Sequence, residues 1–224
     1  MDLRKLQNTD PLKRSVEKQS KAPEFSPMDP PDAYAPPAMD EVPYEAMPKF
    51  LQKLMDDHKN FETVLGTFEE ALARLQENGL KPDKDVDEGL RNFFAFLDDQ
   101  IVGHSLVEQK ILFPLLHDRL IETGEHSKGR LPKTAVDMLE DDHARMMQLA
   151  AVTFNFLGLA ARLPDAPSRA IALDAALEQG RALIELLRLH MFREDNVVFA
   201  LAVKHLAAPD FDEMERRSAL VWPR

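Results

Sequence analysis

Cysteine is absent from the 224-residue chain. Its absence excludes disulfides, thiolate nucleophiles, iron–sulfur clusters and zinc sites of the cysteine type. Glycine-rich phosphate loops and nucleophile elbows are missing as well, so nothing in the sequence indicates nucleotide binding or acyl transfer. Any metal site in this protein must therefore be built from histidine and carboxylate side chains.

Basic residues are scarce, because 28 lysines and arginines face 39 aspartates and glutamates, which gives a formal net charge of -11. Recognition of a phosphate backbone requires a clustered basic face, so we expect no nucleic acid partner. No apolar run reaches the roughly 18 residues of a membrane span, and the first residues, MDLRKLQNTDPLKRS, lack the apolar core of a signal peptide. We therefore expect no membrane partner and a cytoplasmic location.

Proline is concentrated at the start of the chain, where residues 1–47 hold 8 of the 16 prolines. This segment includes FSPMDPPDAYAPPAMDEVP and has neither helical nor alternating periodicity. The composition predicts a proline-rich flexible arm. A solvated tail is the simpler interpretation, and a docking segment or a strap along the domain is the alternative.

Long amphipathic segments follow the arm, and they predict an all-α domain of four helices over residues 48–206. A final amphipathic piece within residues 207–224 predicts a short C-terminal helix outside the bundle, with Trp222 as an anchor. The predicted inward stripes of the four helices are Phe50, Leu54, His58, Phe61, Leu65, Phe68, Leu72 and Leu75; Val86, Leu90, Phe93, Leu97, Ile101, His104, Glu108, Ile111 and Leu115; Val136, Leu139, His143, Met146, Ala150, Thr153 and Leu157; and Leu173, Ala176, Gly180, Leu183, Leu187, His190, Glu194, Val197 and Leu201.

Each stripe contains a histidine, and two stripes also contain a glutamate. A single histidine on an apolar face is more often a hydrogen-bonded core residue than a ligand, but one on each of four helices is harder to explain in that way. Glu108 and Glu194 add weight, because an unpaired ionised glutamate in a core costs several kcal/mol unless a cation neutralises it or its pKa shifts. A divalent or trivalent metal would supply that cation.

Helix lengths allow a test of whether these side chains can meet. His58 lies about 20 residues before the end of its helix and His104 about 19 after the start of the next, so both are roughly 30 Å from their shared turn. His143 and His190 match one another to within about one turn by the same count. This count does not determine the position of one hairpin relative to the other along the bundle axis, because the loop after the second helix is long and Pro114 disturbs that helix.

The four-residue spacing of His104 with Glu108, and of His190 with Glu194, turns each pair toward the same side of its helix. Six inward ligands are too many for a structural zinc ion, which takes four. Two bridging carboxylates and four imidazoles suit a pair of metals with open positions. Nitrogen and oxygen donors with vacant sites favour two iron ions, with manganese or zinc less favoured.

Four motifs follow one another along the predicted helices: DDH ending at His58, HSLVEQKILFP starting at His104, EDDH ending at His143 and HMFRE starting at His190. Through them the segment from Pro48 to His205 resembles the hemerythrin-like, cation-binding HHE domains. The resemblance implies an up-down-up-down four-helix bundle with a non-haem, carboxylate-bridged di-iron centre. It implies that the terminal ligands are His58, His104, His143 and His190. It also implies that the bridging ligands are Glu108 and Glu194.

The sequence departs from the oxygen-carrying hemerythrins at two places. The carriers have a second histidine four residues after the one on the third helix, where this chain has Met147. This loss weakens the expectation of a reversible oxygen carrier. The carriers also place their carboxylate five residues after the last histidine, at Asp195 here. We favour Glu194, because five residues turn about 140° away from the inward stripe.

The resemblance favours a protein that binds or reduces oxygen, nitric oxide or peroxide, in oxidative or nitrosative stress, with an unidentified electron donor. Whether it is an enzyme is left open, as is the oligomeric state. One alternative is a sensor or carrier, or an iron-handling protein without turnover. Another is an interaction bundle whose polar core residues only fix the register. We expect His117, His126 and His205 outside the site.

Overall fold

A computed structural model of the protein describes Tyr34 and residues 42–222. Most of the predicted arm, residues 1–47, lies outside the described residues, and Tyr44–Ala46 within it forms the 3-10 turn η1. All further regular structure in the described part is helical. In chain order it comprises α2 (Lys49–Asn78), α3 (Lys84–Phe96), the π-helical turn η2 (Leu97–Ile101), α4 (Val102–Val107), the π-helical turn η3 (Glu108–Leu112), α5 (Phe113–Thr123), α6 (Ala135–Arg162), α7 (Ala166–Arg193), the π-helical turn η4 (Glu194–Val198), α8 (Phe199–His205) and α9 (Ala208–Val221).

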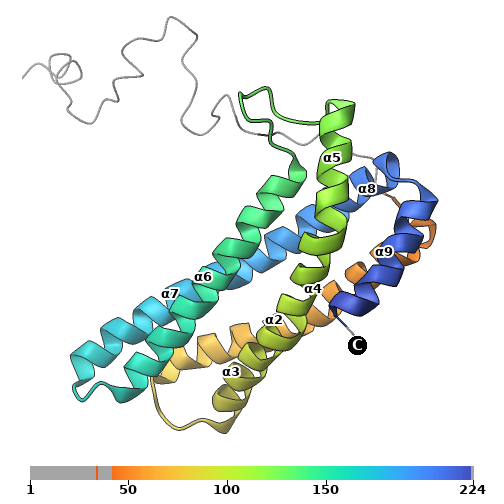
Figure 1. Ribbon diagram of the computed structural model, residues 1–224. Coiled ribbons are helices and arrows are strands. Elements are labelled where there is room, and N and C mark those ends of the chain that lie inside the picture. Colours follow the sequence, from red (N-terminus) through yellow and green to blue (C-terminus); the bar gives the residue numbers. More distant parts are fainter. Residues whose placement is uncertain (1–33, 35–41, 223–224) are drawn as a thin grey trace, which may run out of the picture.

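These elements form the long rods of a bundle (Figure 1). The first rod is α2, the second is the continuous run from α3 to α5, the third is α6 and the fourth is the run from α7 to α8. Contacts join α2 with α3 and α7, and α6 with α7. The predicted all-α, up-down-up-down bundle is therefore confirmed, and so is the short helix that follows it.

The rods begin and end at residues suited to helix termini. α2 ends before Gly79, whose φ of +64° favours a residue without a Cβ atom. The carboxylate of Asp83 caps the first turn of α3. At the start of α6, Thr134 and Asp137 form a capping box, in which the Thr134 N–H donates to the Asp137 carboxylate over 2.7 Å. The two caps fix where the second and third rods start, and thus the level of their side chains along the bundle.

Pro114 lies inside the second rod, which continues through it. A proline lacks the N–H that an α-helix needs, and its ring clashes with the carbonyl group four residues earlier, here that of Lys110. The π-helical turn η3 immediately precedes this position and widens the helix there. The freed Lys110 carbonyl oxygen accepts a long hydrogen bond of 3.4 Å from Arg217 of α9.

The π-helical turns correct two of the predicted inward stripes. A π-helical turn adds one residue to the helix locally, so the side chain that faces the core at η3 and η4 differs by one position from the prediction. Leu116 is fully buried where Leu115 was predicted, and Val198 is fully buried where Val197 was predicted. Leu115 and Val197 are only partly buried. A strict helical period could not anticipate this shift.

The core consists of two apolar clusters with the polar residues of the stripes between them. One cluster lies toward α5 and α9, and the other lies toward α3 and the turn between α6 and α7 (Figure 1). Along α2, Leu54 belongs to the first cluster and Phe61 to the second, and His58 lies between them. The buried histidines and glutamates therefore form a polar layer inside an otherwise apolar core.

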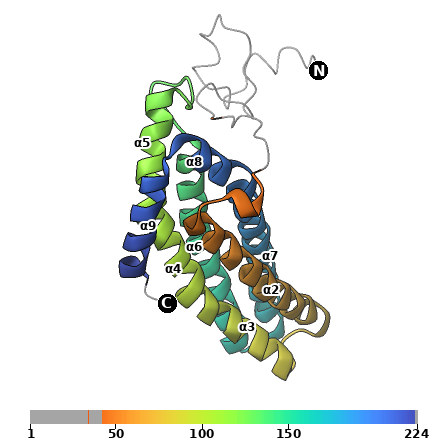
Figure 2. The ribbon, with the colours of Figure 1, turned by 90° about the vertical axis from the view of Figure 1, so that its right-hand side faces the viewer.

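The C-terminal helix α9 packs against α2, α4 and η3 and buries Phe211 and Met214 (Figures 1 and 2). Trp222, directly after α9, lies over Gly103 of α4 so closely that a Cβ atom on Gly103 would be 2.4 Å from the indole ring. Trp222 thus anchors the chain end one residue from His104, in agreement with its predicted role.

No described helix is both long enough and apolar enough to cross a lipid bilayer.

Candidate metal centre

One histidine from each rod reaches the polar layer. The Nε2 atoms of His58 on α2 and His104 on α4 are 3.2 Å apart. The Nε2 atoms of His143 on α6 and His190 on α7 are 3.1 Å apart. All four side chains are at most 5% exposed. The two histidines of each hairpin are therefore level, as the helix lengths predicted.

Two glutamates join the hairpins to one another. Glu108 directs Oε1 toward His104 Nε2 at 3.2 Å and Oε2 toward His143 Nε2 at 3.3 Å. Glu194 directs Oε1 toward His190 Nε2 and Oε2 toward His58 Nε2, both at 3.1 Å. Each carboxylate thus spans both hairpins. These contacts supply the relative level of the hairpins, which the sequence left open.

Two groups of ligand-type atoms result, each compact enough to surround one ion. One contains His58, His104 and Glu194, and the other contains Glu108, His143, His190 and Glu194. The Glu108 Oε1 atom also faces the first group through its 3.2 Å contact with His104. Each half of the centre therefore offers two imidazole nitrogens and one oxygen from each glutamate.

The buried polar atoms of the centre that lack hydrogen bonds are suited to bind cations. Glu108 and Glu194 are fully buried, and none of their four carboxylate oxygens receives a hydrogen bond from the described residues. Buried ionised carboxylates without partners are strongly unfavourable. The Nε2 atoms also face one another in pairs. Metal ions between the imidazoles and carboxylates would satisfy both sets of atoms, so the residues fit a metal centre.

The family model of the hemerythrin HHE cation-binding domain matches residues 49–202. The chain belongs to this family. Comparison with curated proteins and with solved structures gave no match. The matched residues span all four rods of the bundle and include every histidine and glutamate of the centre. The protein therefore carries a metal-binding HHE domain, and its buried histidine and glutamate residues form the candidate metal centre.

Three aspartates lie beside outer nitrogens of the histidines in this HHE domain, and two of them accept hydrogen bonds there. His58 Nδ1 donates to Asp195 over 2.9 Å, and His104 Nδ1 donates to Asp57 over 3.2 Å. Asp142 lies 3.7 Å from His190 Nδ1, which makes no hydrogen bond with the described residues, and accepts a 2.6 Å hydrogen bond from Arg193. A carboxylate that accepts from Nδ1–H fixes the tautomer in which Nε2 carries the lone pair that a metal needs.

The sequence reasoning missed these outer aspartates, although part of the signal was visible. Asp57 and Asp142 each directly precede a stripe histidine, in the motifs DDH and EDDH. Asp195 was considered only as an alternative to Glu194. Glu194 is fully buried and points into the centre, whereas the Asp195 side chain is 30% exposed and contacts His58 from outside.

The carboxylates also determine the charge of the centre in the absence of metal. Burial alone would lower the pKa of His58, but its hydrogen bond to Asp195 and the charge of Glu194 raise it to about 10. Burial opposes a charged His190 too, and the charges of Glu194 and Asp142 raise its pKa to about 10. The pKa of Glu108 is well below its usual range despite burial, because of His104 and His143. Without metal, protonated imidazoles therefore balance the carboxylates.

The remaining histidines lie outside both ligand groups of the HHE domain. His117 Nδ1 is 3.1 Å from the Thr134 hydroxyl and 3.3 Å from the Asp137 carboxylate, so it supports the cap at the start of α6. His126 contacts the Ser127 carbonyl oxygen, and His205 contacts Thr123. All three histidines therefore lie outside the centre, as predicted, and His117 and His126 are partly buried.

Proposed function

We propose that the HHE domain holds two iron ions, bridged by Glu108 and Glu194. The ligands of one ion would be His58 and His104, and those of the other His143 and His190. The observation that carries this proposal is the set of four buried carboxylate oxygens, each facing an imidazole at 3.1–3.3 Å and lacking a hydrogen bond. Nitrogen and oxygen donors that leave positions open favour iron over a closed structural zinc site.

Iron in such a site would supply redox and ligand-binding chemistry toward oxygen, nitric oxide or peroxide. The chain's own residues prepare the centre for this. Asp57 and Asp195 hold two imidazoles in one orientation, and the glutamates keep the two halves at a fixed separation. Aromatic rings limit water, since Phe199 stacks on His58 and Phe113 stacks on His143. This environment supports binding or reduction of a small ligand, with an external electron donor where reduction occurs.

Metal analysis of protein purified from iron-replete cells, together with its absorption spectrum, tests the metal proposal. We expect about two irons per chain, as two bridging carboxylates require. Less than about one metal ion per chain after anaerobic iron reconstitution would contradict it. That result would favour the alternative in which the polar core residues only fix the register of the bundle.

A sensor or carrier role is the second candidate, and the contact between Gly103 and Trp222 favours it. This contact joins the residue next to His104 to the end of α9, so a rearrangement at the centre could reach the surface. Turnover separates the two functions. An enzyme consumes peroxide or nitric oxide catalytically, whereas a sensor or carrier shows only a stoichiometric spectral change.

A further inference from the structure

The two hairpins repeat one arrangement around the centre. In each hairpin the first helix supplies an aspartate followed by a histidine, namely Asp57 with His58 on α2 and Asp142 with His143 on α6. The second helix supplies a histidine and, four residues later, a glutamate. Each aspartate lies beside the outer nitrogen of the histidine on the second helix. The halves of the centre should therefore be equivalent unless another residue distinguishes them.

The residue after each bridging glutamate breaks this equivalence. It is Asp195 after Glu194, and Gln109 after Glu108. Asp195 accepts a 2.9 Å hydrogen bond from His58 Nδ1. The corresponding atom, His143 Nδ1, is buried and has no hydrogen-bond partner among the described residues. In the His58 and His104 half, the outer nitrogens of both histidines thus donate to carboxylates, which brace this half. In the other half neither outer nitrogen makes a hydrogen bond with the described residues, and the nearest carboxylate, that of Asp142, lies 3.7 Å from His190 Nδ1.

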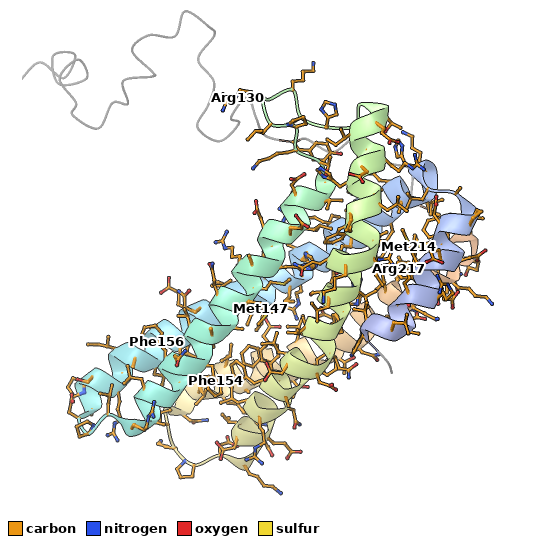
Figure 3. All side chains as sticks on the ribbon, in the orientation of Figure 1. Arg130, Met147, Phe154, Phe156, Met214 and Arg217 are labelled. Atoms are coloured by element: carbon orange, nitrogen blue, oxygen red, sulfur yellow. The ribbon has the colours of Figure 1, made fainter. Side chains whose placement is uncertain are left out.

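A cavity of about 210 Å³ lies on the unbraced side, between α4 and α6. His143 lines it directly, together with Gln109 and Met147. Met147 is 46% exposed and lies on α6, where Figure 3 labels it. The cavity therefore connects the surface of the molecule with a histidine of the centre. Its remaining lining residues are Leu97, Ile101, Val102, Ser105, Leu106, Ala144 and Met146.

The lining of this cavity selects for uncharged molecules. It contains no aspartate, glutamate, lysine or arginine, and its polar groups apart from His143 are Ser105 and Gln109. A charged molecule would lose hydration there without gaining an opposite charge. A larger cavity of about 370 Å³, between α2, α4 and α9, differs in both respects. It includes Lys53 and Glu215, and none of its lining residues belongs to the centre.

We propose that the two halves of the centre are inequivalent, and that a small uncharged molecule reaches the His143 and His190 half through the cavity at Met147. The His58 and His104 half is the braced, structural half. Met147, Ser105 and Gln109 then control the access of dioxygen, nitric oxide or hydrogen peroxide. This inference rests on the proposed function in one respect, since it takes His143 and His190 to hold a metal ion.

Dissolved dioxygen can test the access route without any iron chemistry. The full-length protein is labelled at its methionine methyl groups and reconstituted with zinc, or used as purified if it takes no zinc. The paramagnetic relaxation that dioxygen causes is then measured by NMR. We expect the relaxation enhancement to be several-fold larger at the Met146 methyl group than at the Met214 methyl group. Met146 lines the cavity and is 3% exposed, whereas Met214 is 2% exposed and lies in the other apolar cluster.

The variant Met147→Trp fills the mouth of the cavity, and Gln148→Trp places the same side chain on the neighbouring exposed position. Met147→Trp should abolish the excess relaxation at Met146, and Gln148→Trp should retain it. In the reduced, iron-loaded protein, Met147→Trp should slow nitric oxide association about tenfold by restricting access. Gln148→Trp should leave that rate unchanged.

Equal relaxation at Met146 and Met214, or an unchanged nitric oxide rate in a folded and iron-loaded Met147→Trp protein, would overturn the proposal. If Met147→Trp does not fold, Ser105→Leu blocks the opposite wall and decides the same question. Failure to bind iron would instead contradict the proposed function. The dioxygen measurement would still report whether the cavity is open, so the two failures can be distinguished.

Discussion

Glu194 and Asp195 are adjacent residues with different positions at the centre. Glu194 is fully buried between His58 and His190, whereas Asp195 contacts only the outer nitrogen of His58. The helical period was sufficient to place Glu194 on the inward face. It could not reveal the role of Asp195, because a contact with another helix depends on how the rods pack.

We predict that Glu194→Gln removes at least one iron, because this carboxylate faces both halves of the centre. Asp195→Asn should keep both irons but weaken metal affinity about 10- to 100-fold, as is typical when the partner of a metal-binding histidine is lost. Iron content and chelator competition measure the two effects. Iron loss from Asp195→Asn alone would show that Asp195, at the carrier spacing, is the bridging residue.

The raised pKa values of His58 and His190 predict opposite pH effects on metal-free stability and on metal affinity. Both pKa values rise from 6.5 to about 10 on folding without metal. Their stabilising contribution is therefore complete below about pH 6.5 and is lost as the pH rises toward about 10. Metal affinity should increase over the same interval, because metal must displace these protons.

Urea titration of the stripped protein and metal competition, each between pH 6.5 and 10, provide the measurements. A stripped protein that becomes more stable as the pH rises through this range would contradict the predicted protonation of the centre.

At the scale of the elements, the rods were predictable and their local winding was not. The stripe from Phe50 to Leu75 predicted the first helix, and α2 spans Lys49–Asn78. At η3 and η4 the predicted stripes are wrong by one residue, at Leu115 and Val197, whereas Leu201 beyond η4 is fully buried as predicted. A π-helical turn depends on what the widened helix contacts, such as the α9 residue Arg217 near Pro114, and a single helical period carries no information about this.

Gly103 allows a test of how α9 is attached. Replacing an exposed glycine inside a helix by alanine normally stabilises the protein by about 0.5–1 kcal/mol. Gly66 on α2 should follow this rule, because a Cβ atom there has nothing within 4 Å. Gly103→Ala should instead destabilise the protein, since the new Cβ atom would be 2.4 Å from the Trp222 ring.

Urea unfolding of both variants gives the signs. The emission of Trp222, the only tryptophan in the chain, should shift to longer wavelength in Gly103→Ala as the ring is displaced. If Gly103→Ala is stabilised as much as Gly66→Ala, with unchanged emission, Trp222 does not anchor the chain end.

For the whole molecule, the free energy of folding depends on the polar layer that lies between the two apolar clusters. The sequence indicated this layer, because each stripe carries its histidine, and in two stripes a glutamate as well, within a series of apolar residues. The sequence could not predict the position of one hairpin relative to the other along the bundle axis. That position depends on the loop between α5 and α6 and on how the second rod continues through Pro114. The contacts of Glu108 and Glu194 across the hairpins supply that position.

We therefore predict that metal removal destabilises the entire bundle rather than one helix. Binding that is specific to the folded state adds about 4 kcal/mol when free metal is about 1,000 times its dissociation constant. The stripped protein should consequently lose several kcal/mol, because buried carboxylates and imidazoles remain with poor partners between the clusters. Thermal unfolding of stripped and loaded protein, followed by circular dichroism and by Trp222 fluorescence, measures this loss. Both signals should move to lower temperature together and recover when iron is restored. Equal midpoints for the two forms would contradict a buried metal centre, and a shift in the fluorescence alone would confine the effect to the attachment of α9.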